Sequence, residues 1–289
     1  MEGYLDLYLE PRIPSFLGFP RDISRSKAAI MGIPYDSSST CKPGCRYAPQ
    51  RLRNVSHNLE TYDPIQRIDV AELPVSDIGD VREFLNPYSM VDIVSKVSCE
   101  LNSTGKIVIG FGGDHTVTLG LINGLRRGVS LVMFDAHLDY RNEYPIGERI
   151  SHATVLRRLR EGLAKEAVVI GVRALSKEEV RDLERESNVQ VVYTWASEKD
   201  VDDSLSTLSK DRYVTIDIDV LDPSVAPGVG CPEPGGFTFH QLLNILNRVF
   251  DGKVLGIDVV EVNPLVDIND ITSYLAAKLV MKILSLFFA

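Results

Sequence analysis

The chain has 289 residues, of which 44% are hydrophobic and 25% are charged. This composition excludes a disordered or fibrous protein, and at roughly 100–200 residues per domain the length allows one large α/β domain or two small ones. There are 31 Lys and Arg against 40 Asp and Glu, a formal charge of −9, and no dense basic block. We therefore expect no nucleic-acid or membrane partner and favour a small cationic ligand.

The two chain ends and the cysteines predict a cytoplasmic protein. The segment that begins at Met1 lacks a basic stretch followed by an apolar one, so we expect no signal peptide. Residues 274–289 are strongly apolar, but two lysines interrupt them and the stretch is too short to span a bilayer, which predicts a packed C-terminal helix. The four cysteines are too scattered for a disulfide framework. Cys41 and Cys45 lack the second close pair of a structural zinc site, so we interpret all four as unpaired thiols.

Short apolar runs rich in Val and Ile alternate with helical stretches along the chain. In chain order we predict a strand over 28–33, a helix over 91–104, strands over 106–111 and 130–134, a helix over 155–163, a strand over 167–172, a helix over 177–186, strands over 189–193 and 212–218, a helix over 239–250, a strand over 254–259 and a helix over 271–286. Continuous apolar runs suit strands that are buried on both faces. The alternation predicts an α/β fold with a mainly parallel sheet and helices on both faces. Without a linker or an internal repeat, a single domain over residues 1–289 is the simplest partition.

Unusual polar residues follow the strand over 106–111. Residues 112–116, Gly-Gly-Asp-His-Thr, open an apolar helix, and the two glycines allow a tight turn. Asp114 or Thr116 could cap that helix. No Gly-Lys-Ser/Thr follows the glycines, so this is not a phosphate loop. Taken alone, His115 fits a loop histidine better than a metal ligand.

A second polar group follows the strand over 130–134. Asp135, His137 and Asp139 are two residues apart, and such residues point to the same side of an extended chain. Two carboxylates and an imidazole that converge in this way are metal-ligand chemistry. The alternative is a capping cluster on a solvated turn.

A third group lies at the end of the strand over 212–218. Asp217 and Asp219 alternate with Ile216, Ile218 and Val220, which predicts both carboxylates on one face of an apolar strand. On a half-solvated edge strand this pattern is harmless. On a central strand two unpaired carboxylates are costly to bury, and a divalent cation removes that cost.

Ligands gather at the carboxyl ends of the strands in open parallel sheets. Together the three strand ends offer four carboxylates and two imidazoles, on His115, Asp135, His137, Asp139, Asp217 and Asp219. Two ions that share bridging carboxylates would use all six residues, and oxygen-rich ligation with some imidazole favours Mn²⁺. Coordination lowers the pKa of water, which predicts a hydrolytic nucleophile.

Two further residues fit this site. His152 follows Ser151 at the start of a basic helix over 154–160, although it also fits an exposed histidine beside a helix cap. Glu261 ends the apolar stretch after residue 256 and could bind a planar cation by paired hydrogen bonds, although it also fits a solvated strand end.

The order of these motifs resembles that of the ureohydrolases, the family of arginase and agmatinase. The matching runs are Gly-Gly-Asp-His at 112–115, Asp-Ala-His-Leu-Asp at 135–139, Ser-His at 151–152, Asp-Ile-Asp-Val-Leu-Asp-Pro at 217–223, Pro-Gly-Gly-Phe-Thr at 234–238 and Glu-Val-Asn-Pro at 261–264. The resemblance also includes residues 32–36 and 42–49 and covers nearly the whole chain. It implies a single three-layer α/β/α domain of the arginase fold, two Mn²⁺ ions and a homo-oligomer, usually a trimer or hexamer.

The resemblance also implies a role for each motif residue. One ion would be bound by His115, Asp135, Asp139 and Asp217, and the other by Asp135, His137, Asp217 and Asp219. Asp135 and Asp217 would then be the bridging ligands. Asp139 or His152 would pass a proton to the leaving amine, and Glu261 would hold the guanidinium of a small cationic guanidine substrate.

Substrate choice depends on what the motifs lack. Arg141 stands where arginase-like members have an Asn that reads the α-carboxylate, and residues 171–176 lack the Asp pair that reads the α-amino group. The chain is therefore more similar to agmatinase, which implies hydrolysis of agmatine to putrescine and urea. Ala153 and Cys231 stand where many agmatinases have Gly and Thr, and could reshape the pocket for N1-aminopropylagmatine. Guanidinobutyrate, arginine and a metal-binding protein without turnover are further alternatives.

Overall fold

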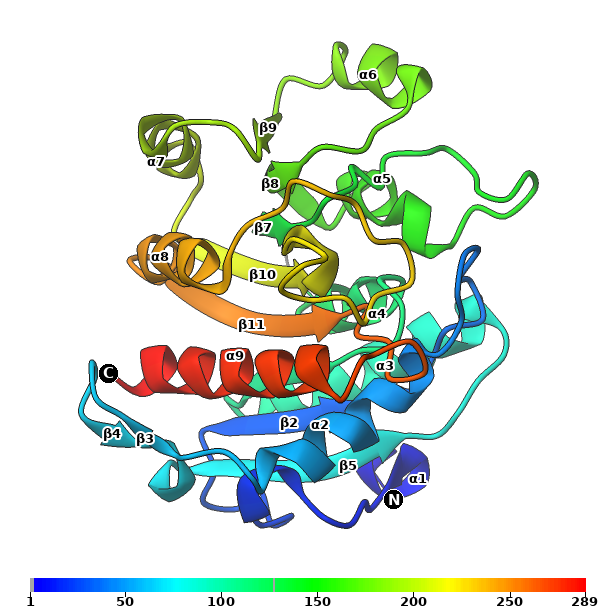
Figure 1. Cartoon of the computed structure of the whole chain (residues 1–289). Helices are drawn as coiled ribbons and strands as arrows, with labels where there is room; N and C mark the ends of the chain where they lie inside the picture. The colour runs from blue at the N-terminus through cyan, green and yellow to red at the C-terminus, as the bar shows by residue number, and fades with distance from the viewer. Residues whose placement is uncertain (1–2, 127) are drawn as a thin grey trace.

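The computed structural model describes residues 3–126 and 128–289. Met1, the first residue of the segment in which we expect no signal peptide, lies outside these ranges. Within them, the centre of the molecule is a nine-stranded sheet of order β1-β5-β2-β6-β11-β10-β7-β8-β9 (Figure 1). Its strands are β1 (Leu9–Glu10), β2 (Ala28–Gly32), β5 (Val75–Val81), β6 (Ile107–Phe111), β7 (Val129–Phe134), β8 (Ala164–Val172), β9 (Val189–Tyr193), β10 (Asp211–Asp217) and β11 (Lys253–Val260). In this part of the chain β1 pairs antiparallel with β5 and the other neighbours are parallel, as predicted. A short hairpin of β3 (Tyr62–Asp63) and β4 (Ile68–Asp69) stands apart.

Helices cover both faces of the sheet, which confirms the predicted three-layer α/β/α architecture. One face carries α2 (Ala48–Ser56), α7 (Glu198–Ser206), α8 (Phe239–Val249) and α9 (Ile271–Phe288). The other face carries α1 (Tyr4–Tyr8), α3 (Pro87–Ser103), α4 (Val117–Asn123), α5 (Val155–Arg160) and α6 (Lys177–Leu183). The buried apolar side chains accordingly form two clusters, one on each side of the sheet.

All seven predicted strands are present within three residues at each end, but β5 is a strand that the sequence analysis missed. Its Asp77 and Asp80 interrupt the apolar run that we used as a signal. Both carboxylates are nevertheless buried, because Arg53 of α2 donates to Asp77 Oδ2 at 2.7 Å and to Asp80 Oδ1 at 2.5 Å. Charge pairing across the layers allows a polar strand in the core.

Helix α9 confirms the predicted packed C-terminal helix, which begins at Ile271 as expected and ends at Phe288. The expectation that the apolar segment is too short to span a bilayer is wrong, because within the described ranges α9 is the one helix long and apolar enough to cross a membrane. More than half of it is buried inside the molecule, where it packs against α2. Its two lysines bond to Glu60 O and to the carboxylate of Asp63. The burial is that of a core helix.

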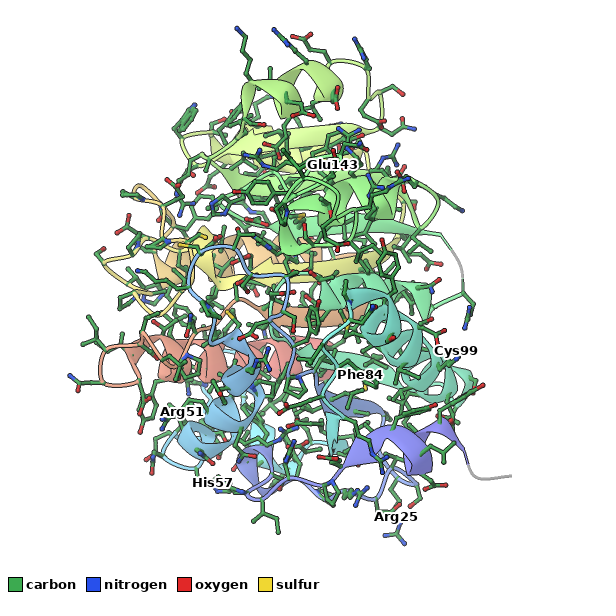
Figure 2. The ribbon with its side chains drawn as sticks, turned by 90° about the vertical axis from the view of Figure 1, so that its right-hand side faces the viewer. Arg25, Arg51, His57, Phe84, Cys99 and Glu143 are labelled. Atoms are coloured by element: carbon green, nitrogen blue, oxygen red, sulfur yellow. The ribbon has the colours of Figure 1, made fainter. Side chains whose placement is uncertain are left out.

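The carboxyl ends of the parallel strands lie on one side of the molecule, the right-hand side of Figure 1. Figure 2 looks onto that side, with Glu143 labelled on the segment that follows β7. The loops after β6, β7, β10 and β11 all emerge there. The fold therefore brings the four polar strand ends of the sequence to one place.

Candidate metal centre

His115 enters the site from the turn between β6 and α4. A Cβ on Gly113 would lie 1.6 Å from the backbone oxygen of Tyr35, so glycine is required there by lack of space. The His115 ring is buried, and its Nε2 lies 3.0 Å from Thr215 Oγ1, which in turn donates to Asp258 Oδ1. This chain of contacts leaves Nδ1 of His115 available to a ligand.

Asp135, His137 and Asp139 converge, but not as an extended strand. Strand β7 ends at Phe134, and Asp139 has a left-handed φ of 50°. The amide of His137 donates to Asp135 Oδ1 at 2.6 Å, so a side-chain hydrogen bond bends the chain. The prediction of convergence is confirmed, and the prediction of its backbone geometry is wrong.

Asp217 and Asp219 also differ from the predicted pattern. Strand β10 ends at Asp217, and Ile218–Val220 forms a 3-10 turn, so the two carboxylates do not share one face of a strand. Asp217 Oδ1 accepts the amide of Asp219 at 2.9 Å and thereby caps the turn. Asp219 Oδ1 accepts the amide of Ala136 at 3.0 Å, which ties the ends of β10 and β7 together.

Five of the six predicted metal ligands form two adjoining clusters, and Asp217 lies beside the first. In the first, His115 Nδ1 lies 3.1 Å from Asp135 Oδ2, 3.1 Å from Asp139 Oδ2 and 3.6 Å from Asp217 Oδ2. In the second, His137 Nδ1 lies 2.9 Å from Asp219 Oδ2 and 3.6 Å from Asp135 Oδ1. Asp135 therefore gives one oxygen to each cluster, as expected for a bridging ligand. Asp217 lies beside the first cluster, and its bridging role stays a prediction.

The electrostatics of the clusters suit a divalent cation. His115 Nδ1 and Asp135 Oδ2 are buried, and neither has a hydrogen-bond partner in the described part of the chain. Burial, followed by the charges of Asp219 and Asp135, raises the pKa of Asp217 well above its usual range. Carboxylate oxygens and imidazole nitrogens arranged in this way fit a cation that accepts oxygen and nitrogen ligands.

A cavity of about 520 Å³ adjoins the clusters. Four of the predicted ligands line it, together with His152 and Glu261; these four are His137, Asp139, Asp217 and Asp219. The amide of His152 donates to Ser38 Oγ at 3.0 Å, and its Nε2 lies 3.2 Å from Thr40 Oγ1. Burial lowers the pKa of His152 to about 4, so the ring is neutral near pH 7. A neutral imidazole can accept a proton, as a proton shuttle must.

Glu261 lies directly after β11 and is held by backbone and side chain. Its φ is 64°, and its amide donates to Gly113 O at 2.9 Å. Its Oε1 accepts the amide of His115 at 2.8 Å, and its Oε2 accepts from Cys45 Sγ at 3.3 Å. Burial, followed by the charge of Asp114, raises the pKa of Glu261 to about 8. A nearby cation would favour its ionised form.

The rim of the cavity includes Arg141, which the sequence analysis named for substrate choice, and Tyr144, which it missed. The Arg141 guanidinium lies 4.7 Å from the ring centroid of Tyr144, whose ring meets His152 edge-on at 6.2 Å. Arg173 donates to Asp219 O at 2.6 Å and to Glu233 O at 2.8 Å, joining two loops of the rim. Long-range contacts of this kind leave no local pattern in a sequence.

Comparison with known proteins places the chain in a family. The family model of the arginase family matches residues 26–285. The chain is 36% identical over 264 residues to the N(1)-aminopropylagmatine ureohydrolase of Thermococcus kodakarensis, covering 88% of each chain. It is 33% identical over 278 residues to the agmatinase of Bacillus subtilis, covering 93% of this chain and 94% of the relative. The crystal structure of the agmatine ureohydrolase of Thermoplasma volcanium superimposes with a TM-score of 0.88 at 33% identity, over 96% of this chain and 94% of that one.

This fold and these matches define a hydrolase of the arginase fold. The chain belongs to the arginase family, and its similarity to agmatinases and ureohydrolases supports a hydrolase that acts on guanidino compounds. The predicted family and fold are thereby confirmed.

Proposed function

We propose that this enzyme hydrolyses the guanidinium group of agmatine to putrescine and urea, at a centre that binds two Mn²⁺ ions. The observation that carries the proposal is the sharing of Asp135 between two His/carboxylate clusters, with the carboxylate of Glu261 in the same cavity. Oxygen-rich donors with imidazole support manganese. We also propose a single-domain, cytoplasmic protein that assembles into a homo-oligomer, a trimer or hexamer.

In this proposal the residues are metal ligands, proton carriers or the carboxylate that binds the substrate, and Asp139 has two of these tasks. The first ion would be held by His115, Asp135, Asp139 and Asp217, and the second by Asp135, His137, Asp217 and Asp219. Two bound divalent ions acidify water and so provide a nucleophile near neutral pH. Glu261 orients the guanidinium by paired hydrogen bonds and holds its carbon near attack distance. Asp139 or the neutral His152 carries the proton that the leaving amine requires.

The choice of agmatine follows from the polar groups that surround the cavity. Arg141 lines the cavity at the position where arginase-like members have the Asn that reads the α-carboxylate. Residues 171–176 offer no carboxylate for an α-amino group. An amino-acid head would lose its hydrogen bonds there, so arginine should be a poor substrate. N1-aminopropylagmatine is the second candidate, because a relative of that specificity is 36% identical and Cys231 and Glu233 line the rim where a longer tail would lie.

Urea release from a substrate panel tests the proposal. The metal-stripped enzyme is reloaded with Mn²⁺ and assayed with agmatine, N1-aminopropylagmatine, guanidinobutyrate and arginine. We expect the highest kcat/KM for agmatine. Asp217→Ala should lose metal and activity together, whereas Glu261→Ala should keep the metal and lose turnover. Absence of urea from every guanidine, or an active Asp217→Ala enzyme with a full Mn complement, would overturn the proposal.

A further inference from the structure

Residues 42–49, Lys-Pro-Gly-Cys-Arg-Tyr-Ala-Pro, match the family pattern but have no task in the chemistry above. Their Cys45 reaches the site nevertheless. It is fully buried at the start of the 3-10 turn Cys45–Tyr47, and its Sγ lies 3.3 Å from Glu261 Oε2. The other oxygen of Glu261 accepts the amide of His115. Among the described residues each carboxylate oxygen therefore has one protein donor.

The backbone that carries Cys45 is fixed from two sides. The amide of Gly44 donates to Asp36 Oδ2 at 2.7 Å, and Asn263 Nδ2 donates to Lys42 O at 2.9 Å. Gly44 has a φ of 143°, and a Cβ there would lie 2.1 Å from Asn263 Oδ1, so only glycine lets the turn approach Asn263 this closely. Since Asn263 follows Glu261 by two residues, one loop anchors both the thiol and the carboxylate.

The chemistry of the thiol makes it a donor. Burial, followed by the charge of Glu261, raises the pKa of Cys45 well above its usual range. A protonated thiol is a weak nucleophile, but beside a carboxylate it can donate a hydrogen bond. Such a bond restricts the side-chain rotamers of Glu261 and leaves its outer lone pairs for a guanidinium.

We propose that Cys45 is a positioning residue, whose thiol holds the Glu261 carboxylate in the orientation that receives the guanidinium. The inference rests on the proposed role of Glu261. The competing interpretation is a small apolar filler, since buried free cysteines commonly act as hydrophobic residues. The two interpretations predict that different substitutions of Cys45 preserve activity. A positioning role requires a side chain that donates a hydrogen bond, whereas a filler requires only a side chain of similar volume.

The test compares Cys45→Ser, which keeps a donor, with Cys45→Val and Cys45→Ala, which remove it. We expect kcat/KM for agmatine to fall about tenfold in Cys45→Val and Cys45→Ala, mainly through KM, because one hydrogen bond to the charged group is lost. Cys45→Ser should stay within about threefold of the parent enzyme. Mn content and Tm should be similar in all variants. Cys99→Ala is the thiol-loss control, because Cys99, which is labelled in Figure 2, lies on α3 and is not among the residues that line the cavity.

Competitive inhibition separates a local effect from a general change of the cavity. The Ki of the free guanidinium ion should rise with KM in Cys45→Val, whereas the Ki of putrescine, which lacks the guanidinium, should not change. Unchanged kinetics in Cys45→Val, or equal losses for guanidinium and putrescine, would overturn the positioning role. If the parent enzyme releases no urea from any guanidine, the proposed function fails. Calorimetric titration of the Mn-loaded variants with guanidinium then still decides whether Cys45 positions Glu261.

Discussion

At the scale of single residues, the direction in which His115 presents its ring is set by a buried hydrogen-bond chain. Nε2 of His115 contacts Thr215 Oγ1, Thr215 donates to Asp258 Oδ1, and Tyr213 donates to Asp258 Oδ2 at 2.8 Å. Because Thr215 gives its proton to Asp258, it must accept the proton of Nε2. The lone pair of His115 is then on Nδ1, beside the carboxylates.

Replacing Thr215 by Val should weaken metal binding. The change keeps the shape of the side chain but removes the acceptor for Nε2, so both the ring orientation and the tautomer of His115 lose their support. We expect the Mn²⁺ affinity to fall by about 10- to 100-fold, measured by competition with a chelator. Thr118→Val is the matched control, because the Thr118 hydroxyl contacts Asp258 and Thr215 but not the His115 ring. Equal losses in both variants would show that the network as a whole, rather than the contact with His115, determines affinity.

At the scale of elements, the sequence predicted strands well and the turns after them poorly. Runs of Val and Ile identify strands because burial on both faces requires apolar side chains at every position. The turns at Asp139 and Asp217 depend on hydrogen bonds between side chain and backbone, which have no period. Strand β5 was not predicted, because Arg53, which pairs with its aspartates, is 24 residues from Asp77 in the chain and gives no local signal. The ligand types could thus be predicted from motif order, and their geometry could not.

Residues 231–233 line the cavity, and the segment that continues from them to Gly236 is tied to the end of the β10 turn by Asp222. Asp222 accepts the amide of Ser224 at 2.9 Å and those of Gly235 at 2.7 Å and Gly236 at 3.1 Å. These hydrogen bonds, with that from the Ser224 hydroxyl as the largest contribution, lower the pKa of Asp222 to about 2. A carboxyl whose pKa is lowered on folding stabilises the folded state above its ordinary pKa of about 3.8 and loses that effect as the pH falls towards 2.

Asp222→Ala should therefore loosen the rim at neutral pH without removing the metal. We expect KM to rise about fivefold, the size of effect given by one or two lost hydrogen bonds, with Mn content unchanged. Hydrogen exchange should accelerate at the amides of Gly235 and Gly236. The difference from the parent protein should shrink as the pH falls through about 2, because the Asp222 carboxylate of the parent protein is protonated there. Unchanged exchange at pH 7 would contradict the anchoring role.

At the scale of the whole molecule, folding brings together charged and polar residues that are far apart in the sequence. His115 and Glu261 are 146 residues apart and are joined by a hydrogen bond. Among the described residues, eleven buried carboxylates stand against two buried arginines, so the excess negative charge lies inside the molecule and includes the carboxylates at the strand ends. Folding without a cation must therefore place several like charges in a low-dielectric site.

Metal removal should accordingly destabilise the entire fold. A ligand at 100 times its Kd contributes about 2.7 kcal/mol, and 1 kcal/mol shifts Tm by about 2–4 °C in a large domain. We expect a chelator to lower Tm by about 5–10 °C in calorimetry or thermal-shift measurements, reversibly on addition of Mn²⁺. Asp217→Ala should show little further change with the chelator. If neither the chelator nor Mn²⁺ changes the Tm of the parent protein, that result would contradict the proposed metal centre.

The turn at Gly113 has a consequence for how such an enzyme can change. The turn carries His115 and also binds the backbone of Glu261, so the group that would hold the metal and the group that would hold the guanidinium cannot move independently. The rim, in contrast, includes Arg141, Tyr144 and residues 231–233, which in the described part of the chain share no backbone hydrogen bond with that turn. Under the proposed function, the turn beside the guanidinium and the rim that would contact the tail of the substrate are thus separate segments. Variants with substitutions confined to the rim should differ in the guanidines that they accept, while all of them keep the same metal ligands and Glu261.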